Sequence, residues 1–383
     1  MFISTLLLII GSITLYWLHN QYHLDVVLEE TDPPQNPPLI SVCVPARNEA
    51  RNIRRCVDAL LAQDYPNFEV IVLDDRSTDG TSEILAELSE VDERLKVING
   101  VELPEDWAGK PHALRQASVA ARGAWLCFVD ADTFPASGTL SAVYAKALET
   151  EADFFTIFTH QEMVTFWERT ILPLVLTALS VGFPPKKVND PKSKIAIANG
   201  QFIFVKRKVY DALGGHGAVK DSIAEDKDLA VVTKSAGYRL IVGDGSGFVR
   251  TRMYTSLPEM WEGWTKNIYL GLRDDPRLAG LGVFGAFLAL SAGLLIPVWT
   301  GIGIYLMVTS PNQESIVVLV TSLLLWLNLI VWRVIANKAM DVPAWYAITA
   351  PLGAGVFAAM MFASAFKVIS GKGVVWKGRR YQR

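Results

Sequence analysis

CFVDADTF, residues 127–134, ends an apolar run with two aspartates that are separated by one alanine. On an extended backbone, Asp130 and Asp132 stand at positions i and i+2 and point to the same side. Their carboxylates repel each other there unless a cation lies between them. A buried strand that finishes in this way predicts a site for a divalent metal ion at the strand's end.

The residues around this stretch alternate between apolar strands and amphipathic helices. LISVCVP, FEVIVLDD and RLKVING are typical of strands, and EARNIRRCVDALLAQ between the first two has apolar residues at helical spacing. This alternation predicts an α/β domain with a parallel sheet covered on both faces. Ligands of such sheets bind at the carboxyl ends of the strands, and here these ends carry PARNE, DDRSTDG and DADT.

The composition predicts a membrane protein. The chain has 383 residues, 51% of them hydrophobic, and its apolar runs at 2–18, 281–308, 316–332 and about 345–366 are near or above the roughly 18 residues that suggest a membrane span. A cleaved signal peptide is the alternative for the first run, but a basic start and a small-residue cleavage site are both missing. We therefore expect an anchor at 1–20, a proline-rich linker at 21–38, a catalytic domain at 39–275, a transmembrane region at 278–368 and a basic tail at 369–383.

The distribution of charge predicts which side of the membrane the chain faces. The net charge is only −3, but the tail GKGVVWKGRRYQR is strongly basic, which favours the cytoplasm and, in a cell with two membranes, the inner one. Three simple spans after a cytoplasmic domain would leave this tail outside. Either one apolar segment is re-entrant or interfacial, or residues 278–309 form a hairpin. We expect residues 166–183, which contain Pro173, to form an interfacial helix or a buried one.

Several other residues have both a chemical and a structural interpretation. Asp74 or Asp75 can bind a ligand or cap the next helix, and the charged run that begins at Glu225 and Asp226 can hold a catalytic base or be a solvated helix start. His160 and His216 lack partners at metal-ligand spacing, so we expect structural or surface roles. The scattered Cys43, Cys56 and Cys127 suit a reducing cytosol.

Five motifs in order, VPARNEA, VLDDRSTDGT, WAGKPHAL, FVDADT and IAEDKDLA, resemble those of the inverting family 2 glycosyltransferases. The resemblance covers residues 39 to about 273. It implies a GT-A (Rossmann-like) fold, a nucleotide-sugar donor, most simply UDP-linked, and Mn²⁺ or Mg²⁺ as cofactor. The anchor, the C-terminal spans and the ending VVWKGRRY are similar to the membrane-bound branch that glycosylates lipids, such as ceramide glucosyltransferases and hopanoid- or carotenoid-associated glycosyltransferases.

The resemblance also implies roles for single residues. Asp132 matches the direct metal ligand, with Asp130 beside it, and Asp226 matches the general base, for which Glu225 is the alternative on chemical grounds. Pro45, Ala46, Arg47 and Glu49 match residues that surround the nucleotide. Asp75 matches the residue that reads the base, and Lys110 matches a lysine near the donor. We add Gly200, where a side chain would obstruct a bound sugar, although a strand-turn glycine is the alternative.

One departure from the family affects the expected product. Many processive members carry Q-x-x-R-W after the base, and here the stretch is EMWEGWTKNIYLG. Trp261 and Trp264 are candidates for aromatics at the membrane interface, for an acceptor platform or for structural roles. Lys266 is a candidate for a diphosphate contact. We therefore expect transfer of a single sugar to a lipid hydroxyl at the cytoplasmic face and no nucleic-acid partner. A polysaccharide synthase and a catalytically silent scaffold are the alternatives.

Overall fold

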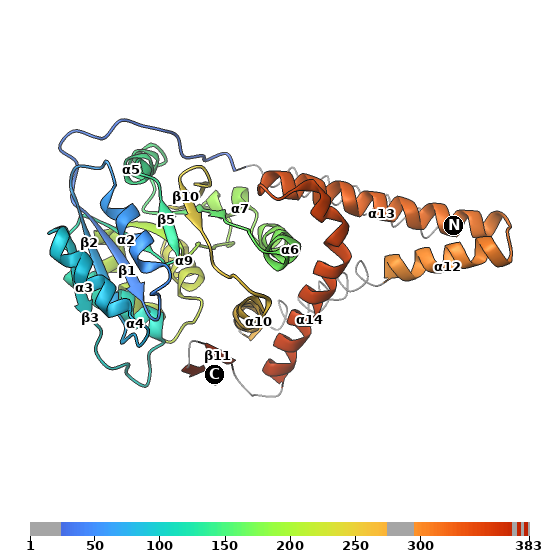
Figure 1. The fold of residues 1–383 in the computed structure, drawn as a ribbon. Coiled ribbons are helices and arrows are strands. Elements are labelled where there is room, and N and C mark those ends of the chain that lie inside the picture. The colour runs from blue at the N-terminus through green and yellow to red at the C-terminus, as the bar shows by residue number, and fades with distance from the viewer. Residues whose placement is uncertain (1–23, 274–294, 370–373, 377–378, 382–383) are drawn as a thin grey trace. The chain divides into compact units, whose positions relative to one another are not determined.

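The computed structural model describes residues 24–273, 295–369, 374–376 and 379–381 (Figure 1). The expected anchor at 1–20 and the first part of the run 281–308 lie outside these residues. The described chain divides into two compact units. The sheet unit comprises residues 24–162 and 183–253, and the helical unit comprises residues 163–182 and the described residues from Tyr254 onward. The expected catalytic domain, 39–275, therefore contributes residues to both units.

The sheet unit is built on a seven-stranded mixed sheet in the order β3-β2-β1-β4-β8-β6-β9. The first four strands are parallel, as predicted, whereas β8 runs antiparallel between β4 and β6. Strand β9 is again parallel to β6. The strands are β1 Ile40–Ala46, β2 Phe68–Asp74, β3 Leu95–Asn99, β4 Trp125–Val129, β6 Phe154–Phe158, β8 Phe202–Lys206 and β9 Leu240–Asp244.

Helices cover both faces of this sheet because its central strands are apolar on both sides. Val42 and Val44 of β1 join one core cluster with residues of α2, α3 and α5, while Cys43 joins the other with residues of α4 and α9. All three cysteines are buried and free. The helices of this unit are α2 Ile53–Leu61, α3 Thr81–Val91, α4 Gly109–Ala120, α5 Thr139–Glu149, α7 Pro185–Asn189, α8 Arg207–Ala212, the 3₁₀ helix η1 Gly215–Val219, and α9 Glu225–Ser235.

Two smaller features complete the sheet unit. A three-stranded sheet has the order β5-β10-β7, with β5 at Thr133–Pro135, β10 at Val249–Thr251 and β7 at His160–Gln161. Residues 26–28, within the predicted linker, pair with β9: the Leu28 N–H donates to the Asp244 carbonyl at 2.9 Å. The linker therefore begins by covering an edge of the large sheet.

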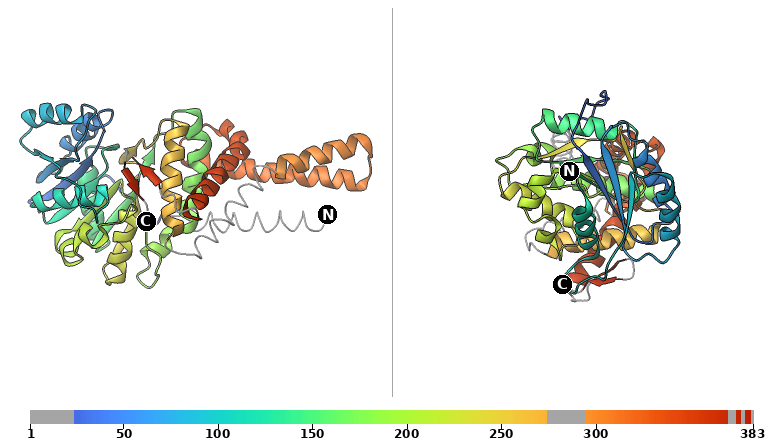
Figure 2. Two further views of the ribbon diagram at one scale, coloured as in Figure 1. Left: turned by 90° about the horizontal axis from the view of Figure 1, so that it is seen from below. Right: turned by 90° about the vertical axis from the view of Figure 1, so that its left-hand side faces the viewer.

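The helical unit contains an antiparallel hairpin of two apolar helices, α12 (Ile296–Thr309) and α13 (Gln313–Ala339), which lie side by side in Figures 1 and 2. Asn312 caps the second of them, since its side chain accepts the Ser315 N–H at 2.9 Å. A further helix, α14, contacts mainly α6 and α10 rather than α13. The elements are α6 Phe166–Gly182, α10 Leu257–Arg273, α12 Ile296–Thr309, α13 Gln313–Ala339, η3 Ala344–Thr349, α14 Ala350–Ile369, β11 Val374–Trp376 and β12 Arg379–Tyr381.

Helix α6 contains Pro173, and α13 supplies a replacement for the hydrogen bond that this proline removes. A proline has no N–H to donate to the carbonyl four residues earlier, which here is that of Arg169. The guanidinium of Arg333 donates to this carbonyl at 2.6 Å and to that of Thr170 at 3.0 Å. A donor from a neighbouring helix is how a proline is tolerated inside an apolar helix.

Three described segments are long and apolar enough to cross a membrane, namely Phe166–Asn189, Gln313–Ala339 and Ala344–Lys367. The last two contain the predicted runs 316–332 and 345–366. The first contains residues 166–183, for which we expected an interfacial or buried helix. The described part of the run 281–308 includes α12, which has 14 residues and is shorter than a span.

Candidate functional site

The loops that follow β1 and β2 are joined by hydrogen bonds at the carboxyl edge of the sheet. The main-chain N–H of Asn48 donates to Ser77 Oγ at 3.0 Å, and its side-chain oxygen accepts the Thr78 N–H at 2.9 Å. The N–H of Glu49 donates to Thr81 Oγ1 at 2.9 Å. Pro45, Ala46, Arg47 and Glu49, the residues expected around the nucleotide, therefore lie in or next to a loop whose shape is fixed without a ligand.

Asp74 and Asp75 differ in their contacts. Asp74 accepts hydrogen bonds from the Ser77 N–H at 3.0 Å and from the Ser82 hydroxyl, so it stabilises the turn that leads into α3. Asp75 is buried, and its main chain bonds to Ala46 and Arg47. The structural role proposed for one aspartate of this pair falls to Asp74, which leaves Asp75 as the candidate for reading the base.

Lys110 joins two carboxylates that come from distant parts of the chain. Its ammonium nitrogen lies 2.7 Å from Asp130 Oδ1 and 2.8 Å from Glu225 Oε1. Lys110 stands in the first turn of α4, Asp130 directly follows β4, and Glu225 begins α9. We call Lys110, Asp130, Glu225 and the adjacent Asp226 the charge cluster. The structure thus brings together four of the predicted site residues.

The pKa values of the two acidic residues at the start of α9, Glu225 and Asp226, are shifted in opposite directions. Burial and, second, the negative charge of Glu225 raise the pKa of Asp226 to about 6 against the opposing effect of Lys110. For Glu225, burial favours the neutral form, but the ion pair with Lys110 outweighs it and lowers the pKa. Asp226 is therefore the better proton acceptor near neutral pH, and Glu225 is the ionised partner of Lys110.

Asp130 and Asp132 do not lie on an extended backbone, so the geometric argument from positions i and i+2 was wrong. Strand β4 ends at Val129, and the Thr133 N–H bonds to the Asp130 carbonyl at 3.1 Å, which closes a turn. The cation found next to Asp130 is the Lys110 ammonium. Among the described residues, no three His, Cys, Asp or Glu side chains are grouped to hold a metal by themselves. Two carboxylates fit Mg²⁺ or Mn²⁺, which also take ligands from substrate phosphates.

Gly200 lies next to the charge cluster, and its predicted role in making room for a sugar stays a prediction. Its N–H donates to Asp226 Oδ2 at 2.9 Å. A Cβ atom at this position would stand 2.8 Å from the same oxygen and 3.1 Å from the Lys110 nitrogen. The absence of a side chain therefore makes room for Asp226 and Lys110.

Residues 41–214 match the model of the glycosyl transferase family 2. This segment is a family 2 glycosyltransferase domain. The fold of the whole chain is similar to that of the mannosyltransferase PcManGT of Pyrobaculum calidifontis, which was solved with GDP-Man and Mn²⁺. The TM-score is 0.56 and the sequence identity 20%, over 96% of this chain and 97% of that one. At this identity the likeness shows the fold alone, and it confirms the predicted GT-A architecture.

Two relatives are similar to parts of the chain. Glycosyltransferase AglE of Haloferax volcanii is 37% identical over 100 residues, which are 26% of this chain and 32% of AglE. The 4,4'-diaponeurosporenoate glycosyltransferase of Staphylococcus aureus is 27% identical over 236 residues, or 61% of each chain. The chain therefore spans less than two thirds of either relative. The second name agrees with the predicted similarity to carotenoid-associated glycosyltransferases.

Three predicted residues lie outside the sheet unit. Trp261, Trp264 and Lys266 belong to α10 of the helical unit, and their roles stay predictions. Trp264 is buried with its ring centroid 6.2 Å from that of Tyr254, which agrees with a structural role. Trp261 is 36% exposed and remains a candidate for contact with an acceptor or a membrane.

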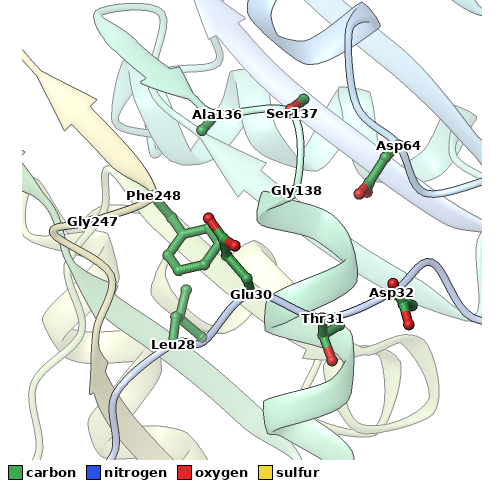
Figure 3. A pocket seen from close by; sticks show the side chains of 10 residues that line it. All are labelled: Leu28, Glu30, Thr31, Asp32, Asp64, Ala136, Ser137, Gly138, Gly247 and Phe248. Carbon is green, nitrogen blue, oxygen red and sulfur yellow. The ribbon is translucent and has the colours of Figure 1, made fainter.

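A surface hollow of about 860 Å³ lies elsewhere in the sheet unit (Figure 3). It contains none of the predicted site residues of the glycosyltransferase domain. Its lining residues are Leu28, Glu30, Thr31, Asp32, Asp64, Ala136, Ser137, Gly138, Gly247 and Phe248. The charged side chains that the chemistry needs are in the charge cluster and not in this hollow. We therefore do not place the donor in the hollow, although it is large.

Sequence reasoning missed one group of residues beside the charge cluster. His216 was expected to be structural or at the surface, and it is fully buried with Nδ1 2.8 Å from the Tyr210 hydroxyl. Burial lowers its pKa to about 4, so the imidazole is neutral. The only signal in the sequence was the Gly-Gly pair before it, which indicates a tight turn and no more.

Proposed function

We propose that the chain is an inverting glycosyltransferase that moves one sugar from a nucleotide-sugar, with UDP as the first candidate, to the hydroxyl of a lipid. The observation that carries this proposal is the charge cluster at the carboxyl edge of the GT-A sheet. It combines a proton acceptor, Asp226, with a cation, Lys110, that is held beside Asp130.

In this reaction the residues of the charge cluster have different roles. Asp226 takes the proton of the acceptor hydroxyl. At the same time the oxygen of that hydroxyl forms a bond to the anomeric carbon, and the bond from that carbon to the diphosphate breaks. Attack opposite the leaving group inverts the configuration. Lys110 offsets the charge that grows on the departing diphosphate. Glu225 keeps Lys110 in place and does not compete for the proton, because it stays ionised.

Asp132 and Asp130 would hold the divalent metal. Bound there, Mn²⁺ or Mg²⁺ would act as a Lewis acid toward the diphosphate. For the nucleotide, the end of β1 and the loop after it offer Pro45, Ala46, Arg47 and Glu49, and Asp75, after β2, is our candidate for recognising the base. Because these loops are already hydrogen-bonded to each other, nucleotide binding needs little ordering of the chain.

A lipid acceptor and a membrane location are supported by the helical unit. Its long apolar helices suit a bilayer, and the relative named for 4,4'-diaponeurosporenoate suggests an apolar acceptor. The basic tail and the catalytic domain (39–275) are both cytoplasmic if the apolar run 281–308 and α13 each cross the membrane and α14 and α6 lie at the interface. In a bacterium with two membranes we place the protein in the inner one.

Calorimetry on the detergent-purified full chain tests the donor and the metal. We expect one UDP-sugar to bind with Mn²⁺ and to lose most of its affinity in chelator. Asp132→Ala should abolish this metal dependence, because it removes the expected direct ligand, while the exposed control Asp221→Asn should retain it. If GDP-sugars bound more tightly than UDP-sugars, GDP would take the place of UDP as the proposed donor nucleotide. Failure of every nucleotide to bind would favour the silent scaffold.

A further inference from the structure

His216 lies where the three elements that carry the charge cluster meet. Its ring packs edge-on against Phe128 of β4, with ring centroids 4.8 Å apart, and Phe128 stands two residues before Asp130. The charges of Glu225 on α9 and Lys110 on α4 both act on the imidazole. A side chain in this place can transmit a change in one element to the other two.

The hydrogen bonds around His216 assign its tautomer. Ser118 Oγ donates to the Arg115 carbonyl at 2.8 Å, so it accepts from the Tyr210 hydroxyl at 3.2 Å. The Tyr210 oxygen then accepts twice from His216, from its main-chain N–H at 3.1 Å and from its Nδ1–H at 2.8 Å. All hydrogen-bonding groups of Tyr210 are satisfied in this arrangement, which keeps the proton of the neutral imidazole on Nδ1.

The two glycines before His216 let the chain wrap around Tyr210. Gly214 and Gly215 have φ values of 80° and 56°, in the left-handed region. A Cβ atom on Gly215 would stand 2.4 Å from the Tyr210 ring. The bonds between His216 and Tyr210 therefore fix the path of the segment that these residues begin, 214–224.

Segment 214–224 in turn makes hydrogen bonds to the starts of α4 and α9, the helices that carry Lys110, Glu225 and Asp226. The carbonyl of Lys220 accepts the N–H of Ala108, the N-cap residue of α4, at 2.6 Å. The hydroxyl of Ser222 accepts the N–H of Ala224, the N-cap residue of α9, at 3.1 Å and donates to Asp228 at 2.6 Å. One segment thus locates the helix starts that carry Lys110, Glu225 and Asp226.

We propose that His216 is a positioning residue for sugar transfer: through its Nδ1–H bond to Tyr210 it locks segment 214–224 and so sets the distance between Lys110 and the Glu225–Asp226 pair. The inference rests on the proposed function. His216 touches neither donor nor acceptor and moves no proton. Its effect falls on kcat because displacements of about 1 Å at reacting groups cost rate more than they cost ground-state binding.

Asparagine and glutamine at position 216 distinguish a role of the Nδ1–H hydrogen bond from a role of side-chain volume alone. The amide nitrogen of asparagine reaches the place of Nδ1, whereas the amide of glutamine reaches the place of Nε2. We expect His216→Phe and His216→Gln to lower kcat roughly tenfold. His216→Asn should stay close to wild type, and Tyr210→Phe should resemble His216→Phe. In all four variants UDP affinity should change little. His160→Asn, a histidine on β7, serves as the control.

Hydrogen exchange gives a readout that does not depend on activity. In His216→Phe the amides of Ala108 and Ala224 should exchange faster than in wild type, and in His216→Asn they should not. Wild-type exchange and wild-type kcat in His216→Phe, or equal effects of Asn and Gln, would overturn the positioning role. If the wild-type chain transferred no sugar, the proposed function would fail, while the exchange data would still decide whether His216 fixes the two helix starts.

Discussion

The sheet unit and the helical unit each contain a buried or half-buried cationic side chain, and the two have different kinds of partner. Lys110 lies between two carboxylates, Asp130 and Glu225. Arg333 is 3% exposed and donates to two main-chain carbonyls, while its Nε and Nη1 have no partner among the described residues. The first arrangement holds charge that chemistry can use. The second completes a helix that a proline interrupts.

The largest effect should come from the proton acceptor of the charge cluster. Asp226→Asn should lower kcat by about 10²–10⁴-fold, because the amide cannot accept the hydroxyl proton. Its affinity for UDP, measured by calorimetry, should stay near wild type. Asp58→Asn, on the exposed face of α2, is the matched control. A variant that still transferred sugar at the wild-type rate would show that Asp226 is not the base.

Removing the cation of the cluster should cost less, but it should also change the pH profile. Lys110→Met should lower kcat by about 100-fold, since a charge that stabilises the leaving diphosphate is lost. Lys110 also holds the pKa of Asp226 down, so its removal should move the acid limb of the rate profile to higher pH. Lys192→Met, on the surface of the same unit, should change neither quantity. An acid limb that stays in place would contradict the assignment of that limb to Asp226.

The wild-type profile tests the burial of Asp226 directly. A base must be deprotonated, and the pKa of this carboxyl in the free chain is raised to about 6, so kcat/KM should fall as the pH drops through about 6 and level off above it. Below that point the loss should approach tenfold per pH unit. Steady-state rates between pH 5 and pH 8 would show it. A profile that is flat down to pH 5 would mean that the base has the pKa of an exposed aspartate.

The smallest effect concerns Arg333, and a double-mutant cycle measures it. Pro173→Ala restores an N–H donor for the Arg169 carbonyl, so Arg333→Met should destabilise the chain less in that background than in wild type. The expected coupling is about 1 kcal/mol, the usual net value of one hydrogen bond. Thermal unfolding in detergent gives both comparisons. Strictly additive effects would show that the guanidinium does not replace the bond that Pro173 removes.

The sequence was sufficient to predict what depends on local pattern. The apolar runs and helical spacing identified strands β1 to β4, the helices between them and the carboxyl ends where Asp75 and Asp130 stand. Contacts between distant segments could not be predicted in this way. No periodicity indicates that Lys110 meets Glu225, that β8 runs antiparallel, or that Gly200 makes room for Asp226. The bonds from Arg333 to the carbonyls of Arg169 and Thr170 could not be predicted for the same reason, since they join two separate helices.

The most direct test of the central claim is the anomeric configuration of the product. The full chain would be incubated with an α-linked UDP-sugar, Mn²⁺ and a membrane lipid extract, and the glycolipid formed would be purified for proton NMR. A single displacement assisted by Asp226 predicts a β-linked sugar, read from the coupling constant of its anomeric proton. An α-linked product would contradict the inverting mechanism and the role of Asp226 in it.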